Sequence, residues 1–365
     1  MPDVRTLAGR LFPWFDRVAR PLPWRGCGDA WGILVSEVML QQTQVATVIP
    51  YWLAFMERFP TPAALASATE REVLKAWEGL GYYRRARMLQ STALALVTRC
   101  GGSLPPDLEA LRALPGLGPY TSAAVASLAF GVPAAAVDGN VLRVWARWSG
   151  DTRDIGLEKT RKAVAAALQG GVPTSRPGAF NEALMELGAT VCTPRSPRCD
   201  ACPLAEDCVA RAEGRQAALP VKHARTKVRS VVMVQVVLEG PAGVWIRRAP
   251  ADGLLGGMTT WPMRVLEVAH PPEALSSPPD SILAAQAEIC RSLGADPCTH
   301  KLLHRHRFRF THLDADIWTF LVTAVDLDAV RDTEGEWVPR EALGQLPWPA
   351  ALQPVRDRLL PVVAP

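Results

Sequence analysis

The segment from Cys192 to Cys208, CTPRSPRCDACPLAEDC, places four cysteines within seventeen residues. Cys199 and Cys202 form a CxxC pair, and the other two cysteines stand seven positions before it and six positions after it. Such spacing is typical of a metal site, and by itself it fits zinc as well as an iron–sulfur cluster. The remaining cysteines have no metal-like spacing and are predicted to be ordinary thiols: Cys27, Cys100, Cys290 and Cys298.

Glu37 is the first candidate for acid–base chemistry. It lies in the segment ILVSEVMLQQTQ, which predicts a helix that is apolar nearly all round and therefore buried or lining a cleft. A carboxyl group in such surroundings loses solvation, so its pKa should rise and it could act as a general acid near neutral pH. The alternative is a glutamate on one solvated stripe of this helix, shared with Gln41 and Gln44.

A second carboxylate, Asp138, follows a glycine-rich turn. The segment LPGLGPYTSAAVASLAFG, residues 114–131, predicts a turn at Gly116 and Gly118 and then a helix of small residues. Glycines permit positive φ and close approach of a partner, and the N–H groups at the helix start favour an anion such as a DNA phosphate. An interhelix turn without a ligand is the alternative. Asp138, in VPAAAVDGNVLRVWARW, either caps the next helix or places a carboxylate beside a bound nucleotide.

The elements that must position these groups fall into two predicted regions. Residues 1–215 have apolar positions at three- and four-residue steps and predict a mainly α region. The polar, basic stretch 216–229 predicts a linker. The run SVVMVQVVLEG-PAG-VWIRRA predicts a β-hairpin at the start of a mixed α/β domain over 230–365. Within that domain, FRFTHLDADIW predicts an alternating strand with Thr311 near a turn.

The charge differs between the two halves of the chain. Residues 1–229 carry 28 Lys and Arg against 20 Asp and Glu, a net +8, and residues 230–365 carry 12 against 16, a net −4, which sums to +4. A basic first half favours contact with a polyanion. No window has the apolar length of a membrane span, and the N-terminus lacks a signal-peptide pattern. A cytoplasmic, reduced protein is therefore expected, in which structural disulfides are disfavoured.

Taken together, these motifs resemble the helix-hairpin-helix DNA glycosylase superfamily with a [4Fe-4S] cluster, and within it the MutY-type adenine DNA glycosylases. The resemblance extends over about residues 22–208 through the strings LPWR, ILVSEVMLQQTQVATVIPY, GLGYYRRAR, LPGLGPYT, VDGNVLRV and FNEALMELGA and the cysteine set. It implies a catalytic region over 1–215 with a helix-hairpin-helix at about 111–131, and a cluster loop over 192–208. The cluster ligands would be Cys192, Cys199, Cys202 and Cys208.

The resemblance also implies a reaction. A monofunctional glycosylase of base excision repair would flip adenine, mispaired with 8-oxoguanine or guanine, out of duplex DNA and hydrolyse its N-glycosidic bond. Glu37 would protonate the base and Asp138 would stabilise the oxocarbenium ion, with Tyr120 and Asn140 positioning them. The adenine pocket would consist of Arg20, Trp24, Arg25, Leu40, Val45 and Glu182. Endonuclease-III-type enzymes carry a lysine where Tyr120 stands, so strand cleavage through a Schiff base is not expected.

The same resemblance also implies which protein residues would contact the 8-oxoguanine in the other strand or the DNA backbone. Contacts with 8-oxoguanine or the DNA backbone are expected from Gln42, Leu80, Tyr82, Gly116, Gly118, Phe310, Thr311 and His312. The segment FTHL resembles the family's Phe-Ser-His loop but has Thr311 in place of serine, and GLLGGMTTWP resembles the start of its Nudix-like domain. No glutamate-rich Nudix box follows, so pyrophosphatase activity is not expected.

Other interpretations remain open on the residues alone. A lyase resembling endonuclease III, a non-catalytic iron–sulfur DNA-binding protein and a zinc-binding regulator each fit part of the pattern. A monomer that binds duplex DNA and no membrane is the expectation for partners.

Overall fold

The computed structural model describes residues 2–223, 228–268, 277–296, 300–323, 330, 332 and 334–361. Two compact units make up the chain: Met1–Ala68 with Arg87–Ala224, and Thr69–Ala86 with Arg225–Pro365. The predicted linker 216–229 is described only in part, because residues 224–227 lie outside the described ranges, as does Cys298. No helix in the described ranges is long and apolar enough to cross a membrane.

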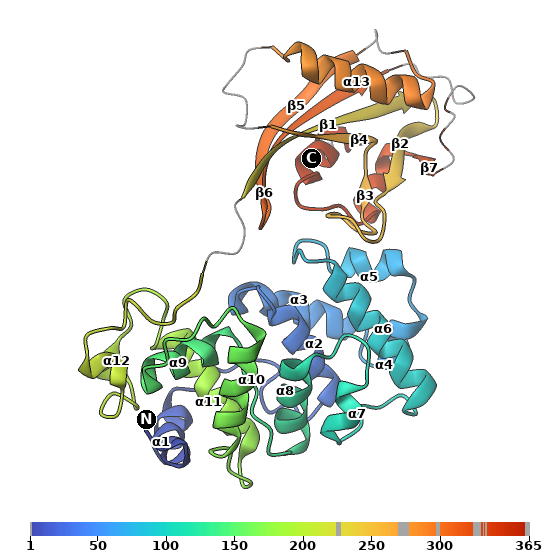
Figure 1. Cartoon of the computed structure of the whole chain (residues 1–365). Helices are drawn as coiled ribbons and strands as arrows, with labels where there is room; N and C mark the ends of the chain where they lie inside the picture. The colour runs from blue at the N-terminus through green and yellow to red at the C-terminus, as the bar shows by residue number, and fades with distance from the viewer. Residues whose placement is uncertain are drawn as a thin grey trace. The chain divides into compact units, whose positions relative to one another are not determined.

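The first unit is helical (Figure 1). Its helices are α1 (Leu7–Val18), α2 (Ala30–Leu40), α3 (Val45–Arg58), α4 (Pro62–Ser67), α6 (Arg84–Arg99, which begins in the second unit), α7 (Leu108–Arg112), α8 (Pro119–Phe130), α9 (Gly139–Ser149), α10 (Glu158–Gln169), α11 (Pro177–Thr190) and α12 (Val209–Ala212), with 3-10 turns at Val4–Thr6 and Cys199–Ala201. The mainly α prediction for this region is confirmed. The aromatic and aliphatic faces of α1, α9 and α11 form one core.

Small residues allow close packing among the central helices α2, α8 and α11, and a side-chain cap fixes the start of α2. Asp29 caps α2, since its carboxylate accepts from Trp31 N and Gly32 N. In α8 the small residues Thr121 to Ser127 are all buried, and α8 packs against both α2 and α11. Gly188 on α11 lies so near Asn140 that a Cβ there would stand 2.6 Å from the Asn140 Cβ. The absence of a side chain at Gly188 therefore sets the distance between α11 and the start of α9.

The second unit is built on a seven-stranded sheet. Its strands are β1 (Arg229–Gly240), β2 (Gly243–Arg248), β3 (Thr259–Thr260), β4 (Met263–Glu267), β5 (His300–Arg309), β6 (Leu313–Val322) and β7 (Gly335–Val338). The main order is β3-β2-β1-β6-β5, with β4 paired to β1 and β7 paired to β2. β1 and β2 pair as an antiparallel hairpin, which confirms the sequence prediction, whereas β1 and β6 are parallel.

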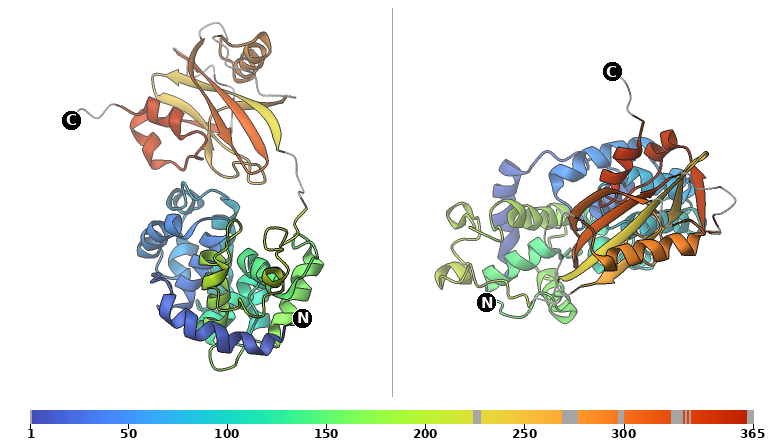
Figure 2. Two further views of the ribbon diagram at one scale, coloured as in Figure 1. Left: turned by 90° about the vertical axis from the view of Figure 1, so that its left-hand side faces the viewer. Right: turned by 90° about the horizontal axis from the view of Figure 1, so that it is seen from above.

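The apolar run of β1 is explained by burial on both faces of the sheet. Val231, Met233 and Val237 belong to a core with the 3-10 turn Arg340–Gln345 and α14 (Gln353–Leu359), and the alternate residues Val232 and Val234 belong to a core with α13 (Asp280–Leu293). Figures 1 and 2 show α13 on one face of the sheet and the C-terminal helices on the other. A strand buried on both sides reads as a continuous apolar run.

One strand prediction is wrong. FRFTHLDADIW is not a single alternating strand, because β5 ends at Arg309 and β6 begins at Leu313. The two strands pair antiparallel, and Phe310 N donates to Leu313 O at 2.8 Å to close the turn between them. The apolar alternation continues across this tight turn, which is why the sequence alone suggested one strand. Thr311 lies in the turn itself, as the sequence indicated.

A segment from the helical half of the sequence packs with the second unit. It contains α5 (Glu70–Ala76), which begins with a capping box between Thr69 and Glu72. Glu78, just after α5, pairs with Arg356 on α14 at 2.7 Å. Residues 69–86, which fall within the predicted region 1–215, therefore belong to the compact unit that contains the predicted domain 230–365.

Candidate active site and metal centre

An open cavity of about 2360 Å³, counting space open to solvent, lies in the first unit. It is walled by α2 and the loop after it, α8, the start of α9, and α11. Ten predicted catalytic and adenine-pocket residues line it: Arg20, Trp24, Arg25, Glu37, Leu40, Val45, Tyr120, Asp138, Asn140 and Glu182. The fold thus brings together groups from four parts of the sequence, while their roles stay predictions.

Glu37 is buried at the wall of this cavity. Its side chain belongs to the third turn of α2, and the residue is 5% exposed, which excludes the solvated-stripe interpretation. Burial raises the pKa of Glu37 to about 7; Asp138 and Glu182 add to the rise, and the hydrogen bond from Tyr120 opposes it. Near neutral pH the carboxyl group is therefore partly protonated, as a general acid must be.

Tyr120, in the first turn of α8, faces Glu37. Its hydroxyl donates to Glu37 Oε2 and lies 3.8 Å from Met185 Sδ. Burial raises the pKa of Tyr120 well above its usual value, so the phenol stays a neutral donor. None of the residues found to line the cavity is a lysine.

Asp138 caps α9 and also lines the cavity, so the two roles that the sequence left open are compatible. Its Oδ1 caps α9 by accepting from Val141 N at 2.7 Å, and its Oδ2 accepts from Asn140 Nδ2 at 2.9 Å. The same carboxylate lines the cavity. Burial raises the pKa of Asp138, and the hydrogen bonds from Val141 and Asn140 oppose that rise. The helix cap fixes the carboxylate in the cavity wall.

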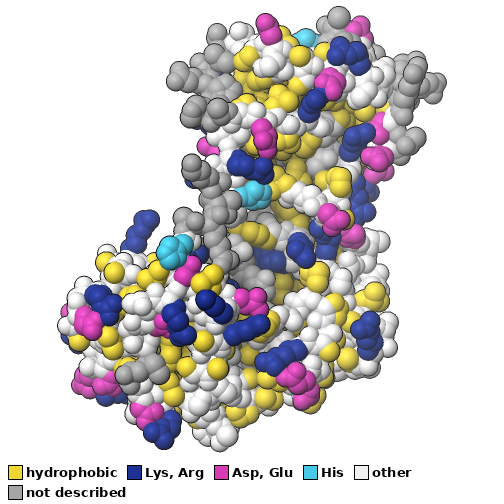
Figure 3. Space-filling view, in the orientation of Figure 1, with side chains coloured by type: hydrophobic (Ala, Val, Ile, Leu, Met, Phe, Trp, Pro, Cys, Tyr) yellow, Lys and Arg dark blue, Asp and Glu magenta, His cyan; other side chains and the backbone are white. Residues whose placement is uncertain are grey.

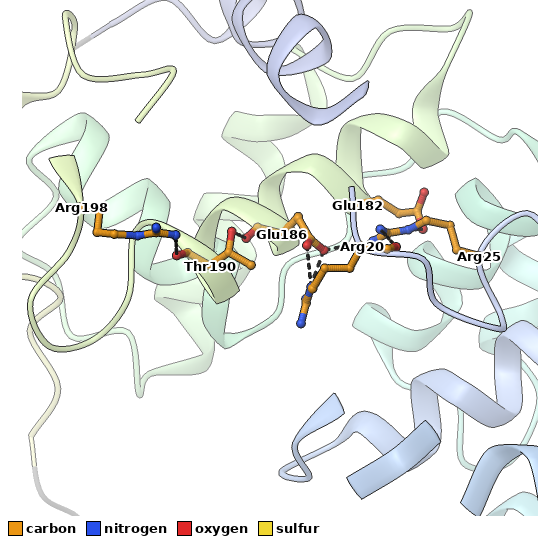
Figure 4. Close-up of polar contacts among 6 residues, drawn as sticks. All are labelled: Arg20, Arg25, Glu182, Glu186, Thr190 and Arg198. Carbon is orange, nitrogen blue, oxygen red and sulfur yellow. Dashed lines mark hydrogen bonds and ion pairs between the residues drawn. The ribbon is translucent and has the colours of Figure 1, made fainter. Parts of the chain in front are cut away.

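A carboxylate that sequence reasoning missed joins the pocket, Glu186. It lies one turn after Glu182 on α11 and is 2% exposed (Figure 4). Arg20 donates to both of its oxygens, and Arg25 Nη2 lies 3.2 Å from Oε2 while Arg25 Nε binds Glu182 at 2.8 Å. The spacing of the two glutamates, four apart on one helix face, was the available signal. The network holds both pocket arginines by their charged ends.

The glycine-rich turn differs at one position from its prediction. Gly116 has φ +83°, and a Cβ there would lie 3.2 Å from Met88 and Thr92, so both its conformation and its packing need glycine. Gly118 has φ −80° as the N-cap of α8, so the prediction of positive φ is wrong there. No side chain caps α8 in the described structure, and a Cβ at Gly118 would meet open space. The start of α8 is thus accessible to an anion.

Two predicted lesion contacts have left-handed backbone conformations that are rare outside glycine. Gln42, after α2, has φ 59° and lines the cavity. Tyr82, in the second unit, has φ 49° and is 42% exposed, whereas its neighbour Leu80 is 6% exposed. Backbone strain of this kind gathers at functional sites. The side chain of Leu80 is therefore packed inside the protein, and that of Tyr82 is accessible.

The exposed turn between β5 and β6 lies beside Tyr82. Thr311 Oγ1 and Tyr82 Oη are 2.7 Å apart, although the residues are 229 positions apart in sequence. Phe310 packs edge-on against Phe308 with ring centroids 4.8 Å apart, and His312 is exposed. Of the predicted lesion contacts in the second unit, Tyr82, Thr311 and His312 therefore form one accessible cluster, whereas Leu80 is buried.

The four cysteines Cys192, Cys199, Cys202 and Cys208 line one cavity of about 310 Å³, counting space open to solvent. Within the described ranges, no three Cys, His, Asp or Glu side chains are close enough together to hold one metal ion. Four sulfurs spread around such a cavity suit a polynuclear cluster better than a tetrahedral zinc ion. Burial raises the pKa of Cys202 to about 12, so its thiolate needs a strong positive partner, which an iron centre supplies.

Two arginines of α9 border the cysteines. Arg143 donates to Cys192 O at 2.8 Å and to Asn140 Oδ1 at 2.7 Å. Arg147 donates to Cys192 Sγ, with the two atoms 3.4 Å apart. Sequence reasoning assigned no role to either of them.

Three family descriptions match this chain. The HhH-GPD superfamily of base excision DNA repair proteins matches residues 35–173, the iron–sulfur binding domain of endonuclease III matches 192–208, and the NUDIX domain matches 233–358. Among solved structures, a thermostable thymine-DNA glycosylase is 29% identical with a TM-score of 0.53, covering 57% of this chain and 97% of that one. Fold, cavity and cysteine set thus define a helix-hairpin-helix glycosylase fold with a [4Fe-4S] cluster and a Nudix-like domain.

Sequence relatives narrow the class. The chain is 30% identical to the adenine DNA glycosylase of Schizosaccharomyces pombe over 375 aligned residues, covering 86% of this chain and 80% of that relative. It is 46% identical to the adenine DNA glycosylase of Homo sapiens over 222 residues, 57% of this chain and 40% of the relative. It is 47% identical to that of Mycolicibacterium smegmatis over 195 residues, 53% and 66%. The chain belongs to the adenine DNA glycosylase family, and its match spans less than half of the human and rat relatives.

Proposed function

We propose that this protein hydrolyses the N-glycosidic bond of adenine mispaired with 8-oxoguanine or guanine in duplex DNA. The observation that carries the proposal is the pair of carboxyl groups at the wall of one cavity, buried Glu37 and partly buried Asp138, whose pKa values are both raised. Membership of the adenine DNA glycosylase family supports the choice of base. The protein would act as a monomer on the mispair.

The cavity is suited to a base that has left the duplex. An extruded adenine would lie between the apolar groups Trp24, Leu40 and Val45 and the charged ends of Arg25 and Glu182. Because Arg25 is already held by Glu182 and Glu186, the polar side of the pocket is preorganised before the base arrives.

Proton transfer and charge stabilisation divide between the two carboxyl groups. Glu37, protonated, would give its proton to a ring nitrogen of adenine, so that the base leaves as a neutral molecule with the electron pair of the glycosidic bond. The sugar then carries positive charge, which the Asp138 carboxylate would stabilise until water adds to the anomeric carbon. Tyr120 would hold Glu37 in place through its hydroxyl group.

A lyase step is not part of the proposal. One solved structure, 25% identical with a TM-score of 0.50, is an endonuclease III trapped as a covalent DNA intermediate. An amine nucleophile has no counterpart here, because the residue facing Glu37 is Tyr120 and the described cavity wall contains no lysine. The product would therefore be an intact strand with an abasic site.

The helical unit would contact DNA through backbone N–H groups more than through a uniformly positive surface. On the face shown in Figure 3, Lys and Arg side chains are interspersed with Asp and Glu. The uncapped start of α8 offers N–H groups and a helix dipole to one phosphate. Thr311, with Tyr82 beside it, would read the 8-oxoguanine base in the opposite strand.

Replacing the general acid tests the proposal. Glu37→Gln keeps the shape of the side chain but has no proton to give, so adenine release should fall by about 10²–10⁴-fold while binding to the mispaired duplex is retained. Single-turnover base release and a gel-shift assay measure the two properties. Glu158→Gln, an exposed carboxylate paired with Lys162, is the control and should release adenine normally. A Glu37→Gln protein with normal release would contradict the assignment.

A further inference from the structure

Arg147 contacts both the cluster loop and the first part of the predicted linker. Its residue is 2% exposed and lies in the last turns of α9. The guanidinium donates to Cys192 Sγ at 3.4 Å and to the carbonyl oxygens of Thr193 at 2.7 Å and Pro194 at 3.1 Å. From the same group, Nε lies 3.0 Å from Gln216 O and 2.9 Å from Leu219 O.

The charge of Arg147 needs a partner that these contacts do not supply. Its described hydrogen-bond acceptors are four carbonyl oxygens and one sulfur, and none of them is a carboxylate. Neutral acceptors alone offset the desolvation of a buried guanidinium poorly. A cluster ligated by four thiolates is a net anion, and Arg147 lies in the wall of the cavity that the four cysteines line.

The predicted linker begins at this cavity and continues along the helical unit. Gln216 lines it, with Nε2 at 4.0 Å from Cys199 Sγ, and Leu219 is 2% exposed. Further along, Val221 O accepts from Ile155 N at 3.0 Å. The chain therefore stays attached to the helical unit beyond residue 215, and the attachment begins at the cavity of the four cysteines.

We propose that Arg147 is a positioning residue through which the bound cluster holds residues 216–223 against the helical unit. The negative charge of the cluster offsets the positive charge of Arg147. The guanidinium group of Arg147 then binds the carbonyl oxygens of the cluster loop on one side and those of residues 216–219 on the other. The start of the connection to the second unit is thereby fixed by the cluster. This role is independent of the substrate and of the reaction proposed above.

Hydrogen exchange on the full-length, cluster-loaded protein tests the proposal. Arg147→Lys keeps the charge, but a single ammonium cannot reach both sets of carbonyl oxygens. Amides in 216–223 should exchange about tenfold faster or more than in the native protein, while α2 and α8 exchange as before. The matched control is Arg198→Met, because Arg198 lines the same cavity but donates to Thr190 O at 2.8 Å (Figure 4). This control should leave exchange in 216–223 unchanged.

The reduction potential of the cluster distinguishes a charge partner from a packing residue. Arg147→Met removes the N–H donor to Cys192 Sγ and the nearby positive charge, both of which favour the more negative, reduced cluster. The potential should therefore fall in this variant. If Arg147→Met does not fold, loaded Arg147→Lys still decides the linker contact by exchange. Unchanged exchange in 216–223 of Arg147→Lys, or equal acceleration in Arg198→Met, overturns the proposal, as does an unchanged potential in folded Arg147→Met.

Discussion

The catalytic cavity and the Thr311 turn are built in opposite ways. In the cavity, Glu37, Asp138 and Glu186 are buried or nearly so, and each of them has at least one hydrogen-bond or ion-pair partner. In the turn, Thr311 and His312 are exposed, and a single side-chain hydrogen bond joins Thr311 to Tyr82. Both regions assemble residues that are far apart in sequence.

The difference follows from what each region is proposed to do. A general acid needs a raised pKa, which burial of the carboxyl group supplies. Burial also requires that every polar group in the region has a hydrogen-bond or ion-pair partner. A base-reading contact needs access to DNA, and its hydrogen bonds form only when DNA is present. Substitutions in the cavity should therefore have large effects, and substitutions in the turn small ones.

After Glu37→Gln, loss of the Asp138 charge should have the largest effect. Asp138→Asn keeps the cap of α9, since asparagine is also a good N-cap, but removes the negative charge facing the sugar. Single-turnover adenine release should fall by about 10²–10³-fold, with stability changed by less than about 1 kcal/mol. A variant that loses activity only through unfolding in a thermal melt would show a structural role alone.

Glu186 tests whether the cavity depends on its buried ion network. Glu186→Gln leaves Arg20 and Arg25 with weaker acceptors, and the free energy of unfolding should fall by about 2–3 kcal/mol. The control is Asp16→Asn, which breaks an exposed pair with Arg176 in the same unit and should cost less than about 1 kcal/mol. Equal losses in urea denaturation of the two variants would refute a special role for the buried pair.

The pH dependence of base release should report Glu37. Its pKa of about 7 means that the protonated, active form is lost as pH rises through about 7, so the rate should fall on that side. Tyr120→Phe removes the hydrogen bond that lowers this pKa, and the alkaline limb should move to higher pH. The rate near neutral pH should change by less than about tenfold. A limb that stays in place would mean that another group sets it.

The smallest effect is expected in the turn. Thr311→Val keeps the shape of the side chain but removes the hydroxyl, and the preference for 8-oxoguanine over guanine opposite adenine should fall by about 3–10-fold. Thr311→Ser is the control and should stay within about twofold of the native protein. Competition between the two duplexes measures the ratio. If Thr311→Val slowed adenine release as much as Asp138→Asn does, the proposed difference between the cavity and the turn would be wrong.

Two cavity residues carried local signals in the sequence, whereas the other predicted cavity residues followed from the family resemblance. Glu37 stands out by its apolar helix and Asp138 by its place before a helix. Glu186 had only its spacing from Glu182 as a signal, and its ion pair could not be predicted because its partner Arg20 is 166 positions away in the sequence. The same holds for Arg147, whose acceptors at 216 and 219 follow only from the packing of the chain.

Local patterns also misled in two places, for physical reasons. Gly118 was expected at positive φ, but a helix N-cap takes an extended conformation that any residue can adopt. The strand expected across Thr311 is interrupted, since alternation of apolar residues carries no information on whether the chain reverses. The pairing of Thr311 with Tyr82 depends on a segment, Thr69–Ala86, that packs outside its own half of the sequence.

Single-turnover base release measures directly whether this protein is a monofunctional adenine glycosylase. The substrate is a duplex with adenine opposite 8-oxoguanine, labelled on the adenine strand, and each sample is analysed with and without alkali. With the native protein we expect free adenine, and strand breaks only after alkali, because no lysine lies among the described residues of the cavity wall. Breaks without alkali, or no release of adenine, would contradict this expectation.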